Sequence, residues 1–350
     1  MPQAPNPASP RPRAVTARAG TNIALVKYWG KRDAALNLPA AGSLSLTLAE
    51  LGSKTRVSFA EAPIPAAAAP ASGRDVVRLG DSIADPRFAA RVSRFLDLVR
   101  ALAGIDLPAS VTTSNSVPTA AGLASSASGF AALALAATRA AGLDLAPAAL
   151  SALARRGSGS AARSIFGGLV EMEAGLRADG ADACAHPLLG PADWDLRLVV
   201  ALTSKGEKAI GSTQAMDHTA ATSPYHAAWL ASVAIDLLAA HRAITMRDLA
   251  ALGAIAERSA LRMHASALAA DPAILYWAPA TVAVVHAVRA ARAQRQLQAY
   301  VTIDAGPHVK VLCRSGDTAA VTALLASVPG VLGTLVASPG EGATVLEVEP

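Results

Sequence analysis

The sequence predicts an α+β fold divided into two domains, and three observations support that class. A chain of 350 residues has enough length for about two domains of ordinary size. Apolar residues make up 52% of the chain and charged residues only 16%, which is the composition of a folded protein with a large core. The expected strands and helices mix without a regular βαβ period, which argues against a doubly wound parallel sheet.

The first domain is expected over residues 16–192, after a disordered, proline-rich tail over residues 1–15. Hydrophobic periodicity and turn residues predict its elements. In chain order these are a strand over 16–28, a strand over 43–48, a loop over 61–75, a helix over 87–102, a strand over 110–113, a polar loop over 114–129 and a helix over 130–139. For as long as strand pairing persists, alternation in the first strand predicts Lys27 and Trp29 on one face and Tyr28 on the other.

The second domain is expected over residues 193–350. It opens on a compact apolar run that is typical of a buried strand. The predicted elements are a strand over 196–202, helices over 226–240, 247–269 and 278–295, and strands over 300–303 and 309–312. In the uncharged stretch 319–338, Pro329, Gly330 and Gly333 predict a helix followed by a turn and a strand.

Composition excludes several classes of protein. The uncharged stretch 107–138 is crowded with polar residues, and proline and glycine interrupt 319–338, so no membrane span is predicted. The opening segment lacks the apolar stretch of a signal peptide, and we expect a cytoplasmic protein. Cys184 and Cys313 have no metal-ligand partners at useful spacing, so we expect two reduced thiols and no metal site.

The net charge of +5 comes largely from the first residues of the chain. Arg11, Arg13 and Arg18 precede the first acidic residue, Asp33. Nucleic-acid binding would need a basic stripe interleaved with aromatic side chains, and the sequence has none. We therefore expect a small-molecule ligand and neither a nucleic acid nor a membrane as partner.

The segment PTAAGLASSASG, residues 118–129, predicts a phosphate site. Small residues let the backbone approach a ligand closely, and serines at the start of a helix place donors where the helix dipole favours an anion. The alternative is an N-capped core helix. The segment lacks the Gly-Lys-Ser/Thr of a Walker A motif and the G-x-G-x-x-G of a dinucleotide site.

Three further segments carry cations or hydroxyls. TNIALVKYWGKRD, residues 21–33, ends a strand in three cations that could clamp an oligoanion, although a solvated strand end has the same pattern. RRGSGSAARS, residues 155–164, joins a Gly/Ser turn to guanidinium groups that could bind phosphate or carboxylate, or else links two helices. Residues 204–216 add weaker evidence, because a surface loop explains them equally well.

Asp304 is a lone acid in TIDAGPH, residues 302–308, where a strand ends at a Gly-Pro turn. It could act as a general base, or it could form a local hydrogen bond within the turn. Together the five segments are anion-binding or acid-bearing turns, without a metal cluster or a Ser-His-Asp arrangement. They favour phosphoryl transfer over hydrolysis at a nucleophilic serine.

These motifs also resemble a known family. PTAAGLASSASG resembles the phosphate loop of the GHMP kinase superfamily, and NIALVKYWGKRD, GSGSAARSIFGG and DAGP are similar to its diphosphomevalonate decarboxylase branch. The resemblance runs in order from about residue 16 to about residue 310. It implies the two-domain GHMP kinase fold, with an N-terminal domain like domain 2 of ribosomal protein S5, a left-handed βαβ crossover and a GHMP kinase C-terminal domain.

The resemblance also implies an activity. Members bind ATP with Mg²⁺ and mevalonate 5-diphosphate, phosphorylate the C3 hydroxyl, and then release phosphate and CO₂ to give isopentenyl diphosphate in the mevalonate pathway. They are often homodimers. By similarity, Asp304 orients or deprotonates the C3 hydroxyl, Lys27 stabilises the charge that develops on the phosphate, and Arg163 holds the substrate carboxylate. Negative charge must be neutralised at every stage, so the catalysis is mainly electrostatic.

The remaining site residues follow from the same resemblance. The expected substrate pocket is formed by Tyr28, Lys31, Ser158, Gly159, Ser160, Arg163, Ser212 and Met216. The expected ATP site is formed by Gly122, Leu123, Ala124, Ser125, Ser126 and Ala127, with Asn115 nearer the adenosine. No residue is assigned to the metal.

The chain departs from the family pattern at two places. Ala40-Ala41-Gly42-Ser43 stands where the family usually has Asn followed by serines, so that a polar contact is expected to be lost there, and His308 replaces the usual Asn after DAGP. These changes leave open a decarboxylase of mevalonate 5-phosphate and a kinase that does not decarboxylate. A non-catalytic binding protein or RNA-binding module is a further alternative, but retention of Lys27, Arg163 and Asp304 favours the decarboxylase.

Overall fold

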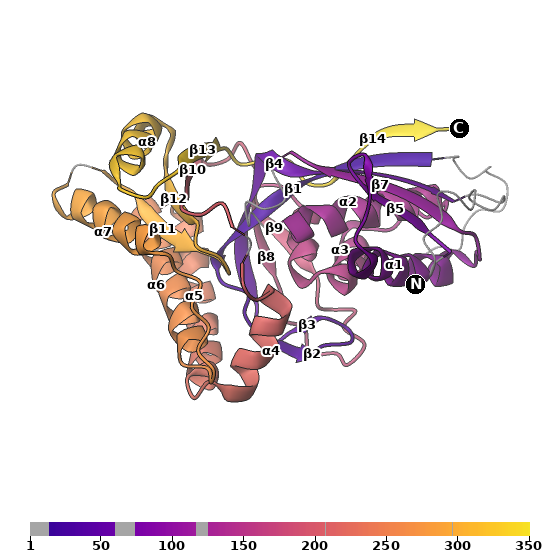
Figure 1. Cartoon of the computed structure of the whole chain (residues 1–350), viewed down its shortest axis with the longest axis horizontal. Coiled ribbons are helices and arrows are strands. Elements are labelled where there is room, and N and C mark those ends of the chain that lie inside the picture. Colours follow the sequence, from indigo (N-terminus) through magenta and orange to yellow (C-terminus); the bar gives the residue numbers. More distant parts are fainter. Residues whose placement is uncertain (1–13, 60–73, 117–124, 207, 296) are drawn as a thin grey trace.

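The protein, represented by a computed structural model, has two sheets with helices packed on both (Figure 1). The structure describes residues 14–59, 74–116, 125–206, 208–295 and 297–350. Strands and helices are mixed, and most strand pairs are antiparallel, so the α+β class predicted from the sequence is confirmed.

The first sheet has the strand order β14-β1-β4-β7-β5-β6, and β8 joins it through β4 and carries β9. Its strands are β1 (Ala14–Val26), β4 (Ser43–Phe59), β5 (Val76–Leu79), β6 (Ser82–Ile83), β7 (Ala109–Asn115), β8 (Leu169–Met172), β9 (Ala185–Leu189) and β14 (Thr344–Glu349). The helices of this part are α1 (Pro86–Ala103), α2 (Ser125–Ala140), α3 (Pro147–Gly157) and the 3₁₀ helix η2 (Gly159–Ile165). A separate ribbon pairs β2 (Lys31–Asp33) with β3 (Leu38–Pro39).

The second sheet has the order β11-β12-β10-β13. Its strands are β10 (Leu196–Leu202), β11 (Tyr300–Ile303), β12 (Val309–Arg314) and β13 (Gly333–Ala337). Its helices are α4 (Ser212–Thr222), α5 (His226–Thr245), α6 (Leu249–Leu268), α7 (Pro279–Ala293), α8 (Thr318–Ser327) and the 3₁₀ helix η3 (Ser315–Asp317).

The second sheet is buried on both faces, which explains the apolar run of β10. Leu198 and Val200 pack with α5 and α6, whereas Val199 and Ala201 pack with α7 and α8. Successive side chains of a strand point to opposite faces, so a strand covered on both sides needs apolar residues at every position. The predicted bounds of β10 and β11 are confirmed for this reason.

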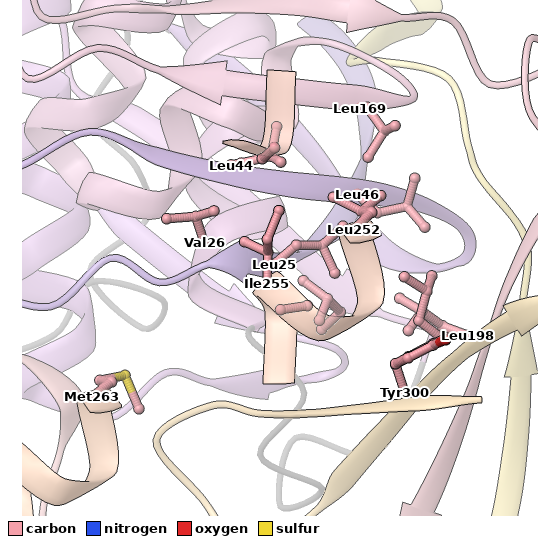
Figure 2. Packing of buried hydrophobic residues seen from close by; sticks show 14 of the residues in the cluster. Leu25, Val26, Leu44, Leu46, Leu169, Leu198, Leu252, Ile255, Met263 and Tyr300 are labelled. Atoms are coloured by element: carbon pink, nitrogen blue, oxygen red, sulfur yellow. The ribbon is translucent and has the colours of Figure 1, made fainter. Parts of the chain in front are cut away.

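One hydrophobic core joins the two sheets (Figure 2). Leu25 and Leu46 from the first sheet lie in the same cluster as Ile255 of α6 and Leu198 and Tyr300 of the second sheet. Helix α6 contacts both β1 and β11. The residues that follow β1 and β11 are therefore brought close to one another.

The structure differs from the sequence predictions in several elements. Helix α2 begins at Ser125, earlier than the predicted residue 130, because small side chains there fit against the sheet, and Ser128 lies 2.7 Å from Ser53 (Oγ to Oγ). Residues 14 and 15, expected in the tail, form the start of β1. Strand β14 pairs with β1, so the last residues of the chain lie in the first sheet although they were expected in the second domain. Most of the expected loop over 61–75 lies outside the described residues.

Helix α5 is the one described helix that is long and apolar enough to cross a membrane, by length and composition alone. Core helices of other proteins pass the same test. Trp229 and Val233 of α5 belong to the core that joins the two sheets, and Ile235 and Leu238 are exposed.

Candidate active site

A cleft of about 1360 Å³ is lined by residues from both parts of the chain, including the end of β1, η2, α4 and the turn after β11. Lysine and arginine side chains outnumber carboxylates among its described lining residues. The five cations are Lys27, Lys31, Arg91, Arg163 and Lys208, and the two carboxylates are Asp217 and Asp304. A concave site with this charge balance suits a ligand with several negative charges.

Asp304 lies at the centre of the cationic part of the cleft, in the turn that follows β11. Its Oδ1 accepts a hydrogen bond from Lys27 Nζ at 2.6 Å, and its Oδ2 lies 3.0 Å from Lys310 Nζ. The side chain is 24% exposed. Burial raises the pKa of the carboxyl, but the two ammonium groups outweigh burial and hold the pKa well below its usual range. Asp304 is therefore ionised in the resting protein.

Lys27 follows directly after β1 and is almost fully buried. Its Nζ also donates to Ala24 O at 2.8 Å, and its backbone N donates to Ser259 Oγ of α6 at 3.0 Å. Burial lowers the pKa of Lys27 to about 8, and the neighbouring Asp304 limits the decrease. The ammonium group is thus fixed at the acid.

Arg163 of η2 is buried among oxygen acceptors from the first sheet. Its Nε and Nη2 donate to Asn22 Oδ1 at 3.2 and 3.1 Å. Its Nε also donates to Ser45 Oγ at 3.0 Å, and its Nη1 donates to Ser43 Oγ at 2.5 Å. Burial lowers its pKa to about 10. Ser43 thus makes a polar contact with Arg163, and the loss of a polar contact expected from Ala40 stays a prediction.

The Gly/Ser segment at the junction of α3 and η2, residues 158–160, faces Tyr28. Ser158, Gly159 and Ser160 line the cleft, and a Cβ atom on Gly159 would overlap the hydroxyl of Tyr28. Burial raises the pKa of Tyr28 to about 12, so the phenol keeps its proton. Tyr28 and Trp29 both line the cleft with Lys27. The alternation of faces predicted for a paired strand does not apply to these residues, because β1 ends at Val26.

The remaining predicted substrate residues also line the cleft. Lys31, Ser212 and Met216 are among its described lining residues, and Lys208 Nζ donates to Ser212 Oγ at 2.9 Å. Burial lowers the pKa of Lys31, and the nearby Asp217 opposes that shift.

The structure describes only part of the predicted ATP site. Ser125 and Ser126 at the start of α2 line the cleft. Ala127 is buried within α2, and Asn115 at the end of β7 accepts a hydrogen bond from Ser53 Oγ at 2.7 Å, so neither contributes to the described lining. Gly122, Leu123 and Ala124 lie outside the described residues.

Several side chains that hold or line the cleft were not among the predicted site residues, and two of them, Asn22 and Arg91, make hydrogen bonds that shape it. Asn22 belongs to the motif over residues 21–33, and it orients Arg163 while its Nδ2 donates to Ser160 O at 2.9 Å. Arg91 of α1 donates from Nη2 to Gly157 O at 2.7 Å. A single arginine on the polar side of an amphipathic helix carries no sequence signal, because most such residues face solvent.

Comparisons with known proteins agree with this geometry. Residues 19–185 match the family described as diphosphomevalonate decarboxylase-like N-terminal domain, and residues 198–334 match the mevalonate 5-diphosphate decarboxylase C-terminal domain. The chain is 37% identical over 331 residues to diphosphomevalonate decarboxylase mvd1 of Aspergillus fumigatus, covering 90% of this chain and 80% of that protein.

Solved structures are similar over nearly the whole chain. Mevalonate diphosphate decarboxylase from Staphylococcus aureus superposes with a TM-score of 0.88 at 35% identity, covering 96% of this chain and 98% of that one. A structure of MDDEF in complex with MVAPP, AMPPCP and magnesium has a TM-score of 0.86 at 39% identity, covering 95% and 99% of the two chains.

Proposed function

Since the chain belongs to the diphosphomevalonate decarboxylase family, with its GHMP kinase fold, and is an ATP-dependent decarboxylase of mevalonate 5-diphosphate, we propose that Asp304, Lys27 and Arg163 carry out the chemistry. The observation that supports this assignment is the partly exposed Asp304 carboxylate, which Lys27 binds at 2.6 Å in a cleft that Arg163 also lines.

The reaction makes two demands on the cleft. The C3 hydroxyl oxygen first takes the γ-phosphoryl group of ATP and loses its proton, which yields ADP. The C3–O bond then breaks with release of phosphate, while the electrons of the carboxylate C–C bond form the double bond of isopentenyl diphosphate and CO₂ leaves. Both steps place negative charge on oxygen, so fixed cations in a partly dry site lower the barrier.

Each of the three residues has a role that its surroundings support. Asp304 is ionised and accepts a hydrogen bond from the C3 hydroxyl, which orients that oxygen and receives its proton as the phosphoryl group transfers. Lys27 stabilises the charge on the transferring and departing phosphate. Arg163 binds the substrate carboxylate, because its terminal nitrogens carry further N–H groups beyond those bonded to Asn22 and Ser43.

The 5-diphosphate is proposed to lie at the Gly/Ser turn and the surrounding cations. Ser158, Gly159 and Ser160 present hydroxyl and backbone groups, and Lys31 and Arg91 add positive charge. The start of α2, with Ser125 and Ser126, is proposed to bind the ATP phosphates, because a helix N-terminus favours anions.

The donor set of the cleft fits Mg²⁺ that arrives with the nucleotide. In the described part of the chain, no group of three His, Cys, Asp or Glu side chains could hold a metal. Mg²⁺ in phosphoryl-transfer sites usually takes phosphate oxygens and waters with one or two protein ligands. We propose the hydroxyls of Ser125 and Ser126 as those ligands. Bound there, Mg²⁺ would neutralise part of the phosphate charge.

We also propose that the enzyme works in the cytoplasm as a homodimer. Cys184 and Cys313 are free thiols, which supports a reducing compartment. The proposal of a dimer rests on the family resemblance.

Separate assays of the products test the proposed function. The protein is incubated with ATP and Mg²⁺ and with mevalonate that carries no, one or two 5-phosphates, and CO₂, ADP and the isoprenoid product are measured. We expect equal amounts of CO₂ and ADP from the diphosphate, and Asp304→Asn should bind nucleotide but release neither. ADP without CO₂ would indicate a kinase, and preferred turnover of the monophosphate would indicate the related decarboxylase. A turnover number unchanged in Asp304→Asn would show that the acid is structural.

A further inference from the structure

Lys310 is a second buried lysine at Asp304 that the proposed reaction has not used. It lies on β12, and its side chain is 1% exposed. Its Nζ is 3.0 Å from Asp304 Oδ2 and donates to His308 O at 3.4 Å. A buried ammonium group is costly unless it is paired, so the fold keeps Lys310 beside the acid at the expense of its hydration.

The β11–β12 hairpin places this lysine. Thr302 and Lys310 are directly opposite each other in the antiparallel register, so their side chains share one face of the sheet. The turn between the two strands carries Asp304. Lys310 thus reaches back along the hairpin to the acid, and it is not among the residues that line the cleft. Its effect on substrate is therefore indirect, through Asp304, which it contacts, and through the charge that it adds near Lys27.

We propose that Lys310 is a positioning residue for the decarboxylation, which binds the second oxygen of the Asp304 carboxylate and so keeps that group ionised and in one orientation. The inference rests on the proposed function. Two ammonium groups, one at each oxygen, fix the plane of the carboxylate, and each oxygen retains a further lone pair for the C3 hydroxyl. With Lys27 alone, the carboxylate could rotate about its Cβ–Cγ bond and the hydroxyl would lose its fixed partner.

Several charged groups surround Asp304, and Lys310 is one of the two whose ammonium nitrogen lies within 3.0 Å of its carboxylate. Other charged or titratable side chains face Asp304 from the end of β1, η2, the loop before α4, and α6. They are Lys27, Arg163, Lys208 and His264. The two lysines bonded to the carboxylate are the main groups that lower its pKa against the effect of burial. Removing one of them should therefore raise the pKa of Asp304.

The experiment compares wild type with Lys310→Met, Lys310→Arg and the control Arg314→Met, an exposed cation on the same strand. The turnover number and the KM values for mevalonate 5-diphosphate and ATP are measured from acid to alkaline pH. For Lys310→Met we expect the turnover number at neutral pH to fall at least about tenfold with little change in either KM, which corresponds to about 1.4 kcal/mol of transition-state stabilisation.

The pH profile supplies the readout that a purely structural role would not change. Asp304 must be ionised, so activity is lost as pH falls through its pKa. When the pKa rises, the acid limb of the Lys310→Met profile moves to higher pH. Lys310→Arg keeps the charge and should restore the wild-type limb and part of the turnover number, while Arg314→Met should match wild type.

Two results would overturn the inference while wild type still decarboxylates. One is a Lys310→Met enzyme with the wild-type turnover number and acid limb. The other is a Lys310→Met enzyme that melts at a lower temperature, with proportionate losses in the turnover number and both KM values and with the acid limb of wild type. If Lys310→Arg also fails to recover activity, this pattern indicates a purely structural lysine. If wild type itself fails to release CO₂, the proposed function fails, which is a separate outcome.

Discussion

At the scale of single residues, the site depends on how each buried cation is held, by a carboxylate for Lys27 and by neutral oxygens for Arg163. Arg163 is the clearest case, because Asn22, Ser43 and Ser45 bind its guanidinium without neutralising it. A buried positive charge with neutral partners remains available to an anionic ligand. The planar group also sets the direction in which its remaining N–H donors point.

We therefore expect Arg163→Lys to lower kcat/KM for mevalonate 5-diphosphate by at least about tenfold. A lysine lacks the planar fork of the guanidinium group, and each hydrogen bond that the arginine makes to a charged partner contributes about 1.5–3 kcal/mol. Steady-state kinetics measure the change. The matched control is Arg177→Lys, an exposed arginine paired with Asp179, which should leave kcat/KM unchanged. An unchanged value in Arg163→Lys would remove Arg163 from the substrate site.

At the scale of elements, the close approach of α6 to β11 holds the acid in place. Gly253 of α6 faces Tyr300 of β11, and a Cβ atom at Gly253 would overlap the tyrosine ring. Asp304 follows β11 directly, and Ser259 of the same helix accepts the backbone N–H of Lys27. The packing of one helix thus fixes both members of the Lys27–Asp304 pair.

Gly253→Ala should destabilise the protein by about 1–3 kcal/mol, because the forced shift of α6 outweighs the gain of up to about 1 kcal/mol in helix propensity. Denaturant unfolding measures the difference. Gly316→Ala serves as the control, since a Cβ atom at Gly316 meets no atom within 4 Å. It should change the stability by no more than about 0.5 kcal/mol. Increased stability in Gly253→Ala would show that Tyr300 moves aside without cost.

At the scale of the whole molecule, the two sheets share one hydrophobic core. That core contains residues from β1 and β4 as well as from β10, β11 and α6 (Figure 2). The cleft also draws its lining from both parts of the chain. A ligand that contacts both parts should therefore stabilise them together.

We expect one main unfolding transition in scanning calorimetry, and we expect mevalonate 5-diphosphate to move it upwards as a single peak. Ligand at a hundred times its Kd adds about 2.7 kcal/mol to the free energy of unfolding. Mevalonate without phosphates is the control, and it should shift the transition less. Two well-separated transitions, only one of which responds to the ligand, would contradict a shared core.

The sequence by itself determined the α+β class, the bounds of β10 and β11, and the motifs that supply most of the charges of the cleft. These properties are local, because hydrophobic periodicity and turn residues act within a few positions of the chain. It also indicated Lys27, Arg163 and Asp304, although their proposed roles came from the family resemblance.

Only the tertiary structure decided which of these charges meet. The pairing of β14 with β1, the placement of Arg91 and Asn22, and the second ammonium group at Asp304 all join residues that are distant in sequence or separated by a turn. The side chains of Asn22, Arg91 and Lys310 carry no periodic signal, since a buried polar residue and an exposed one look alike in a sequence. Lys310 lies beside Asp304 because the fold buries it there, and no local pattern in the sequence contains that burial or that partner.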